Sequence, residues 1–396
     1  MHAGSASHSA ILKFSEAAIW AAGFRPFFTL ALVSGTFLPL IWAIAFSGRI
    51  EFPGSSLSAF QWHAHEMLFG FGWAVLGGFL LTASKNWVKI RGLHGVPLAI
   101  DVALWIMERF VILMPGNARP LWWLGVNGFL TYIAGYVMYS LICFRRQDSF
   151  RDNYFFLIIL PLFVLAKNLI LVPETYAHGV SAAIGLYRVA FLVMFERTMT
   201  QFMKNSMGIE LFRSSFLDFS IKAFAVLAVP SSVLPEPFAI FLFSTLLILL
   251  VVRLSLWRPL AGFRFFGNAV MYLGYLGIVT HLLVEVLHRA HAFSGVGSLS
   301  VHVFTFLVMG LVIPAMLIRI CQGHTGRPIL FSASDRVALG LMGIGAFFRL
   351  IATQLWPELY TTWILLSGLG WSLCFATLSI RLIPFLWKPR IDGRAH

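Results

Sequence analysis

Long apolar segments alternate with short polar connections along most of this chain. A helix needs roughly 20 mostly apolar residues to cross a hydrocarbon core about 30 Å thick. Pro and Gly lie in several of the connections, as at 114–120 and 322–328, where they favour the end of a helix. The pattern predicts twelve transmembrane helices, at about 29–47, 64–83, 97–114, 122–143, 155–172, 178–200, 216–234, 236–254, 269–290, 297–320, 336–354 and 361–386.

Composition supports an all-α, polytopic membrane bundle. Hydrophobic residues make up 59% of the chain, charged residues only 11%, and the mean hydropathy is +0.83. These values lie outside the range of soluble domains. No linker or shift in composition divides the chain, so we expect one integral membrane domain over residues 1–396 and no separate soluble domain.

The net charge of +13 does not indicate a nucleic-acid partner, because Arg and Lys are spread over many short loops and form no basic stripe. The positive-inside rule explains their distribution. In the twelve-helix topology, 18 of the 29 basic residues lie on the side of the termini, and only Arg49, Arg119 and Arg289 lie in loops on the other side. Both termini are therefore predicted to be cytoplasmic.

A histidine-rich motif opens the second predicted helix on its outer side, with His63, His65 and Glu66 as candidate metal ligands. In a regular helix His63 and Glu66 share one side, whereas His65 points about 200° away from His63. The two histidines are therefore not expected to clamp one metal ion. Either one ligates while the other orients it, or each serves a different partner.

More ionisable residues fall in the outer half or middle of other predicted helices. Charges inside a membrane are expensive and usually face a bundle interior or a polar cavity. Their similar depth predicts one buried polar site, in which the arginines would pair with carboxylates such as haem propionates. The residues are Arg109, Lys167, Arg188, His281, His302 and Arg349.

The ninth predicted helix places His281, Glu285 and His288 at i, i+4 and i+7 on one side, a spacing that can supply metal ligands. The alternative is that Glu285 and His288 reach external water while His281 hydrogen-bonds to a neighbour. His302, at the outer end of the tenth helix, is a further candidate ligand.

A glycine-flanked turn, "GHTGR", carries His324 and Arg327 on the cytoplasmic side, about 33 Å from His302 at helical rise. It could present backbone N–H groups and Arg327 to an anion, or it could simply cap the helix. Cys143, Cys321 and Cys374 are isolated, which excludes CxxC motifs and covalent c-type haem.

Several segments together resemble the NnrS family: "FRPFF" at 24–28, "WHAHEMLFGF" at 62–71, the tenth helix running into "GHTGR" at 323–327, and "PRIDG" at 389–393. The resemblance implies a multi-pass protein of the bacterial inner membrane, linked to nitric oxide metabolism, nitrosative stress and denitrification. It also implies non-covalent haem b, and copper as a second cofactor. The chain departs from the family pattern at "FERTMTQFMKN" and "TASKNWV".

The family residues correspond here to His63, His65, Glu66, His302, His324 and Arg327, without assigning a histidine to a cofactor. Turnover, sensing and capture of nitric oxide all stay open, so no catalytic residue is assigned. A polytopic transporter and an electron-transfer subunit with a quinol or other redox partner are the alternatives. HExxH and P-loop motifs are absent from the sequence.

Overall fold

A computed structural model describes residues 17–52, 57–114, 120–150 and 153–394, and all of its regular elements in these ranges are helices. The chain divides into two compact units, which we describe separately. Unit 1 comprises Met1–Leu171, Leu317–Leu330 and Phe375–His396, and unit 2 comprises Val172–Met316 and Phe331–Cys374.

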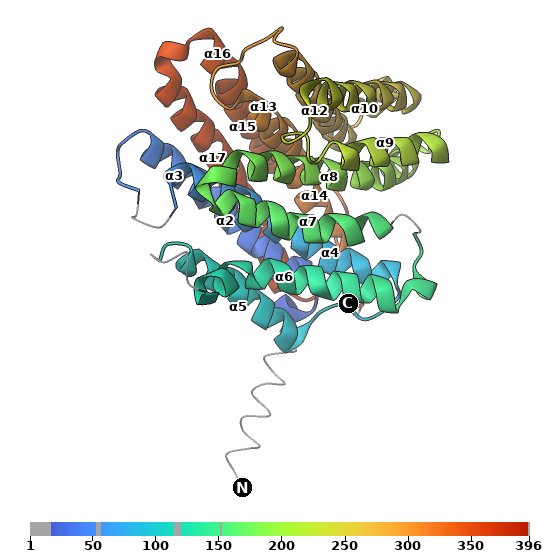
Figure 1. The fold of residues 1–396 in the computed structure, drawn as a ribbon. Helices are drawn as coiled ribbons and strands as arrows, with labels where there is room; N and C mark the ends of the chain where they lie inside the picture. Colours follow the sequence, from blue (N-terminus) through green and yellow to red (C-terminus); the bar gives the residue numbers. More distant parts are fainter. Residues whose placement is uncertain (1–16, 53–56, 115–119, 151–152, 395–396) are drawn as a thin grey trace. The chain divides into compact units, whose positions relative to one another are not determined.

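Unit 1 is built from antiparallel apolar helices (Figure 1). Its α2 and α4 lie side by side because glycines allow close approach: a Cβ at Gly78 would lie 2.8 Å from the Cβ of Phe27, and a Cβ at Gly23 would lie 2.5 Å from that of Leu81. The elements are α2 (Phe24–Phe46), α3 (Ala59–His65), η2 (Glu66–Gly72), α4 (Trp73–Trp87), α5 (Gly95–Val111), α6 (Pro120–Cys143) and α7 (Tyr154–Leu171), with the ends of α14 and α17.

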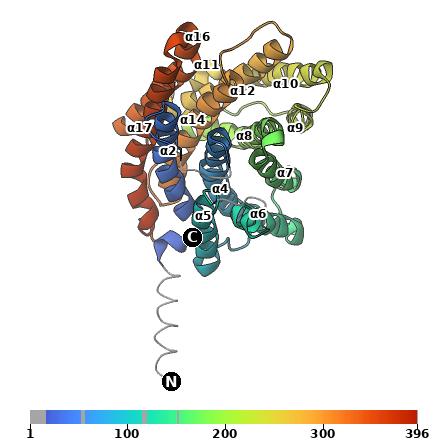
Figure 2. The same cartoon turned by 60° about the vertical axis from the view of Figure 1, so that its left-hand side comes forward.

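Unit 2 is built from the helices between Val172 and Cys374, with only the first parts of α14 and α17. They are α8 (Tyr176–Met207), α9 (Ser215–Leu227), α10 (Glu236–Leu256), α11 (Pro259–Gly262), α12 (Phe266–Arg289), α13 (Leu299–His302), η6 (Val303–Met309), α14 (Gly310–Gly323), α15 (Ala333–Phe347), η7 (Phe348–Ala352), α16 (Thr353–Leu355) and α17 (Tyr360–Trp387). Figures 1 and 2 show these helices from two directions. Again, glycine brings helices together: a Cβ at Gly277 of α12 would lie 2.7 Å from the Cβ of Leu307 in η6.

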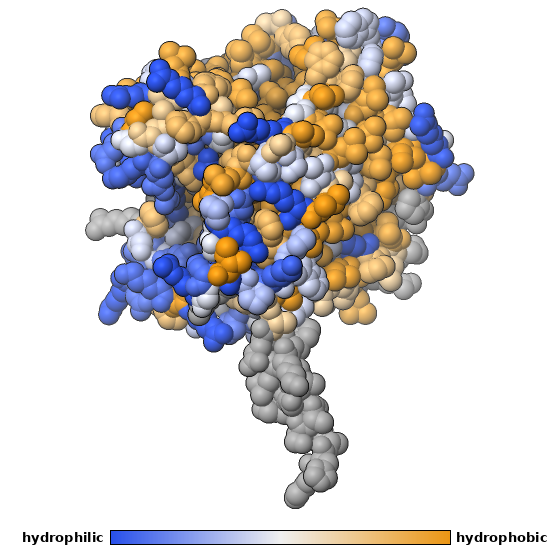
Figure 3. Space-filling model, turned by 180° about the vertical axis from the view of Figure 1, so that it is seen from behind, coloured by the Kyte–Doolittle hydropathy of each residue, from blue (hydrophilic) through white to orange (hydrophobic). Residues whose placement is uncertain are grey.

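Ten helices of the described chain are long and apolar enough to cross a bilayer. The sequence predicted twelve such helices; α5, with 17 residues, and α9, with 13, are shorter than these ten. Large apolar side chains such as Leu121 and Ile380 are about 80% exposed and suit contact with lipid tails. Figure 3 shows apolar residues over much of one face.

Three π-helical segments interrupt the long helices: η2, η6 and η7. A π-helical turn holds about one residue more than an α-helical turn, so it changes the direction of the side chains that follow. Each segment begins beside or contains a residue predicted for the site. Glu66 opens η2, His302 precedes η6, and Arg349 lies in η7.

Candidate cofactor and ligand sites

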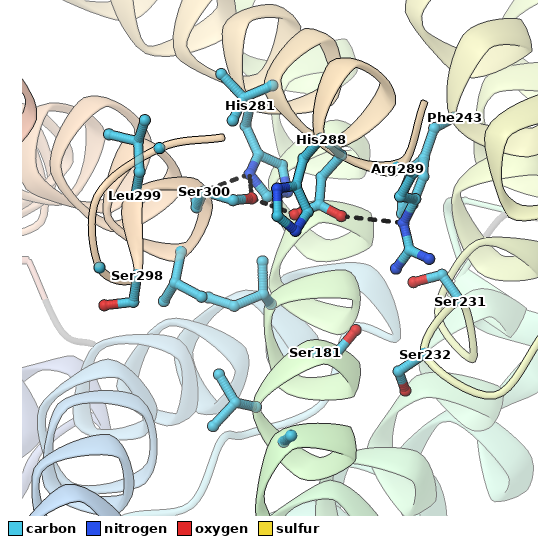
Figure 4. A pocket seen from close by; sticks show the side chains of 18 of the residues that line it. Ser181, Ser231, Ser232, Phe243, His281, His288, Arg289, Ser298, Leu299 and Ser300 are labelled. Atoms are coloured by element: carbon cyan, nitrogen blue, oxygen red, sulfur yellow. Dashed lines mark hydrogen bonds and ion pairs between the residues drawn. The ribbon is translucent and has the colours of Figure 1, made fainter. Parts of the chain in front are cut away.

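A cavity of about 420 Å³, lined by both polar and apolar side chains, lies within unit 2 (Figure 4). Its wall comes from α8, α10, α12, the segment 295–301 that leads into α13, and the turn after α9. Ser231 and Ser232 belong to this turn and lie across the cavity from α12 (Figure 4). Non-helical backbone at membrane depth is tolerated where it is buried in protein or lines a polar cavity, which matches this position.

His281 is fixed at both ring nitrogens. Its Nδ1 lies 3.1 Å from the carbonyl oxygen of Ser300, and its Nε2 lies 3.2 Å from Nη1 of Arg188. A guanidinium only donates, so Nε2 accepts and the proton sits on Nδ1, which donates to Ser300. His281 and Arg188 are each 2% exposed. The cavity therefore presents a neutral imidazole beside a buried cation.

Glu285 lies one turn further along α12 and already has partners at both oxygens. The hydroxyl of Ser300 donates to Oε1, and Nε of Arg289 lies 3.4 Å from Oε2. Arg289 also pairs with Glu236 at 2.8 Å. His281, Glu285 and His288, which the sequence placed on one side of a helix, all line this cavity.

A second group in unit 2 joins His302 to Arg349. Nδ1 of His302 lies 2.8 Å from the carbonyl oxygen of Ser298 and 3.1 Å from Nη2 of Arg349. Arg349 is 4% exposed, and its Nη1 has no hydrogen-bond partner among the described residues. Ser298 also lines the cavity, so the His302 group adjoins it.

Unit 1 holds a buried ionic cluster at the start of η2. His65 lies between two carboxylates, with Nδ1 3.0 Å from Glu66 and Nε2 3.0 Å from Glu108. Arg109 lies 3.1 Å from Glu66 and 3.0 Å from Glu108, and Lys167 pairs with Glu108 as well. The cluster balances two carboxylates against Arg109 and Lys167, which lowers the cost of burying each charge.

Glu66 opens the π-helical turn and contacts the residue before it, His65. His63 instead stacks on the ring of Trp42, with ring centroids 4.3 Å apart. The two histidines thus have different environments.

The "GHTGR" turn lies in unit 1 against two other motifs of the chain. The ring of His324 lies 5.3 Å from that of Phe24 in "FRPFF", and Arg390 of "PRIDG" donates to the His324 carbonyl at 2.9 Å. Arg327 lies over the ring of Phe385 at 4.2 Å. Burial, with Lys85 and Arg390 nearby, lowers the pKa of His324 to about 4. The turn packs three distant segments together.

Sequence reasoning missed three residues that complete these groups: Glu108, Ser298 and Ser300. Glu108 was detectable, because it is an acidic residue beside Arg109 within an apolar run. The serines gave no signal, since their roles depend on carbonyl groups and on the course of the segment before α13.

These features define a polytopic helical membrane protein with buried histidine–arginine groups. The model of the NnrS family, described as "NnrS protein", matches residues 18–390, and the chain belongs to this family. Membership implies a membrane protein related to the response to nitric oxide. No curated protein matches the sequence.

Proposed function

We propose that the protein binds haem b non-covalently in its outer half and acts through it in the response to nitric oxide. The observation that supports this most directly is the setting of His302. Nδ1 of His302 lies 2.8 Å from the Ser298 carbonyl oxygen and 3.1 Å from Nη2 of Arg349, so the ring is held at this nitrogen. If a carboxylate took over Arg349, Nδ1–H could donate to the carbonyl, which is the usual arrangement of a metal-binding histidine. His302 also lies at the start of a π-helical turn, a frequent feature of functional sites.

The surrounding residues fit a haem. The buried Arg349 Nη1 lacks a hydrogen-bond partner in the described chain, and a propionate would supply one. His302 would ligate the haem iron, and Arg349 would hold a propionate. When bound, haem supplies an iron site whose ligation and distal pocket determine how a diatomic gas binds.

His65 is the alternative axial ligand, with Arg109 as its propionate partner. Both ring nitrogens of His65 face carboxylates in the present arrangement, which favours His302. A copper ion needs several convergent ligands. Among the described residues, no three His, Cys, Asp or Glu side chains are grouped to hold a metal ion, so we assign no copper ligand.

The test is the visible spectrum and haem content of purified variants. We expect His302→Ala to lose haem or to change its axial-ligand bands, and Arg349→Met to lower haem content. His324→Ala is the matched control and should keep a native spectrum, because its ring packs in the "GHTGR" turn. Full haem content and an unchanged spectrum in His302→Ala, with loss in His65→Ala, would move the site to unit 1.

We further propose that α5 and the segment 215–234 also cross the bilayer, giving twelve passes in a single domain of the bacterial inner membrane. α5 runs antiparallel to α6: Cβ atoms at Gly125 and Gly128 would lie 2.9 Å and 3.3 Å from side chains of Val111 and Leu104. In unit 2, Lys222 of α9 pairs with Glu196, and Val229 lies against Gly185, both on α8. The turn after α9 therefore continues along α8 toward the helix start.

A further inference from the structure

We infer that the unit 2 cavity is a binding site for a small organic monocarboxylate, held by Arg188. The inference rests on the cavity itself and does not require bound haem. It concerns a ligand distinct from nitric oxide, which is uncharged.

Arg188 places a buried positive charge at the wall of the cavity. Its side chain lines the cavity and the residue is 2% exposed. No carboxylate of the described residues lies within 4.0 Å of it, and its Nε has no hydrogen-bond partner there. Its polar contact is with neutral His281, at 3.2 Å. Glu285 acts on Arg188 only from more than 4.0 Å, and the ring of Phe243 lies 5.1 Å from its guanidinium. A carboxylate in direct contact would lower the cost of burying this cation further.

Glu285 is not in direct contact with Arg188. Its two oxygens contact Ser300 and Arg289 instead. Arg253 shows the contrast within the same unit. It is equally buried, at 1% exposure, but it has Asp218 at 3.6 Å and the Tyr275 hydroxyl at 3.1 Å. Of these two buried arginines, Arg188 is the one that lines the cavity, and no carboxylate of the described residues lies within 4.0 Å of it.

The charge and the lining of the cavity together indicate the class of ligand. The planar donors of a guanidinium match a carboxylate in two-point contact, and Arg188 has no carboxylate in direct contact. The wall combines the hydroxyl groups of Ser181, Ser231 and Ser232 with the apolar side chains of Ile184 and Phe243. The cavity volume of about 420 Å³ is larger than an inorganic anion would fill and lies in the range of small-molecule sites. An aliphatic monocarboxylate fills both the polar and the apolar part.

A haem propionate has the same carboxylate chemistry, so the experiment must separate the two sources. We would measure binding of acetate, propionate and butyrate to the purified full-length protein by calorimetry, with chloride as the reference anion, and haem content in parallel. For a free monocarboxylate we expect affinity to rise from acetate to butyrate, because each added CH₂ is buried. Chloride should not compete.

Arg188→Gln should abolish butyrate binding and leave haem content unchanged. Arg253→Gln is the matched control, a buried arginine that already has its carboxylate, and should keep butyrate binding. If Arg188→Gln does not fold, Arg188→Lys should bind butyrate at least roughly tenfold more weakly, because it keeps the charge and loses the two-point contact.

Two results would overturn the inference. One is butyrate binding that is absent in the wild type or unchanged in both Arg188 variants. The other is loss of haem in Arg188→Gln without any butyrate binding by the wild type, which would identify a propionate as the partner. Failure of the haem proposal looks different: the protein would lack haem and still bind butyrate through Arg188.

Discussion

At the level of single residues, the buried arginines of unit 2 differ in how their charge is compensated. A guanidinium inside a membrane protein needs compensation, and three arginines of this unit receive different kinds. Arg253 has an aspartate, whereas Arg188 and Arg349 each have a histidine. Imidazole carries no compensating negative charge when neutral, so these two positions retain the capacity to attract an anion.

His324 allows a pH prediction outside the spanning segments. Burial lowers its pKa from 6.5 to about 4, so the folded protein favours the neutral ring. The unfolded chain binds more protons between these two values, and stability should fall as pH drops from about 6.5 to 4. We expect a loss of at most about 1.4 kcal/mol per pH unit from this residue.

The measurement is the thermal unfolding midpoint in detergent from pH 7 to pH 4.5. His324→Gln removes the titrating ring and should flatten the decline over this window, while lowering the midpoint at pH 7 through lost packing on Phe24. An identical pH profile in the variant and the wild type would show that other groups control the acid sensitivity.

At the level of elements, the π-helical segments place the site residues. η6 packs on α12, and the contact depends on the absence of a side chain at Gly277, where a Cβ would lie 2.7 Å from the Cβ of Leu307 and 3.0 Å from its backbone oxygen. α12 carries His281, and η6 follows His302 directly. The close contact therefore sets the spacing of the two histidine groups.

Gly277→Ala should push α12 away from η6, lower the thermal midpoint and change the haem spectrum. Overpacking of a close contact typically costs about 1–3 kcal/mol. Gly343→Ala in α15 is the control, because nothing lies within 4 Å of a Cβ there and alanine favours the helix. A midpoint in Gly277→Ala equal to that of Gly343→Ala would contradict the role of this contact.

The sequence predicts the elements well where length and hydropathy decide them. The predicted segment 269–290 corresponds to Phe266–Arg289, and 122–143 to Pro120–Cys143. The predicted segment 216–234 was too long for a helix, since α9 ends at Leu227 before Pro230 and the two serines. The π-helical turns give no periodic signal, because one added residue barely alters an apolar pattern.

The candidate site, too, could be predicted from the sequence only in part. Intramembrane polarity singles out Arg188, His281 and Arg349 from the sequence alone, because polar residues are rare in apolar runs. Their partners depend on which helices adjoin and on backbone carbonyl groups. The pairing of His281 with Ser300, and of His302 with Ser298, therefore required the fold.

For the whole molecule, the number of passes fixes which loops face the cytoplasm. Ten crossing helices and twelve crossing segments are both even numbers, so both place the termini on one side. They differ for the loops between α5 and α9. If α5 does not cross, the basic residues Arg145 and Arg146 that follow α6 face outward, against the positive-inside rule.

Cys143, the last residue of α6, reports on this difference directly. It is exposed, whereas Cys321 and Cys374 are buried. In the twelve-pass arrangement Cys143 lies on the cytoplasmic side, and we expect a membrane-impermeant thiol reagent to label it only after the cells are opened.

A cysteine replacing Arg49, in a Cys143→Ser background, should be labelled on intact cells and serves as the external control. Labelling of Cys143 on intact cells would show that α5 does not cross. Failure to label the cysteine at position 49 would reverse the orientation, because the loop after α2 is external only if the N-terminus is cytoplasmic.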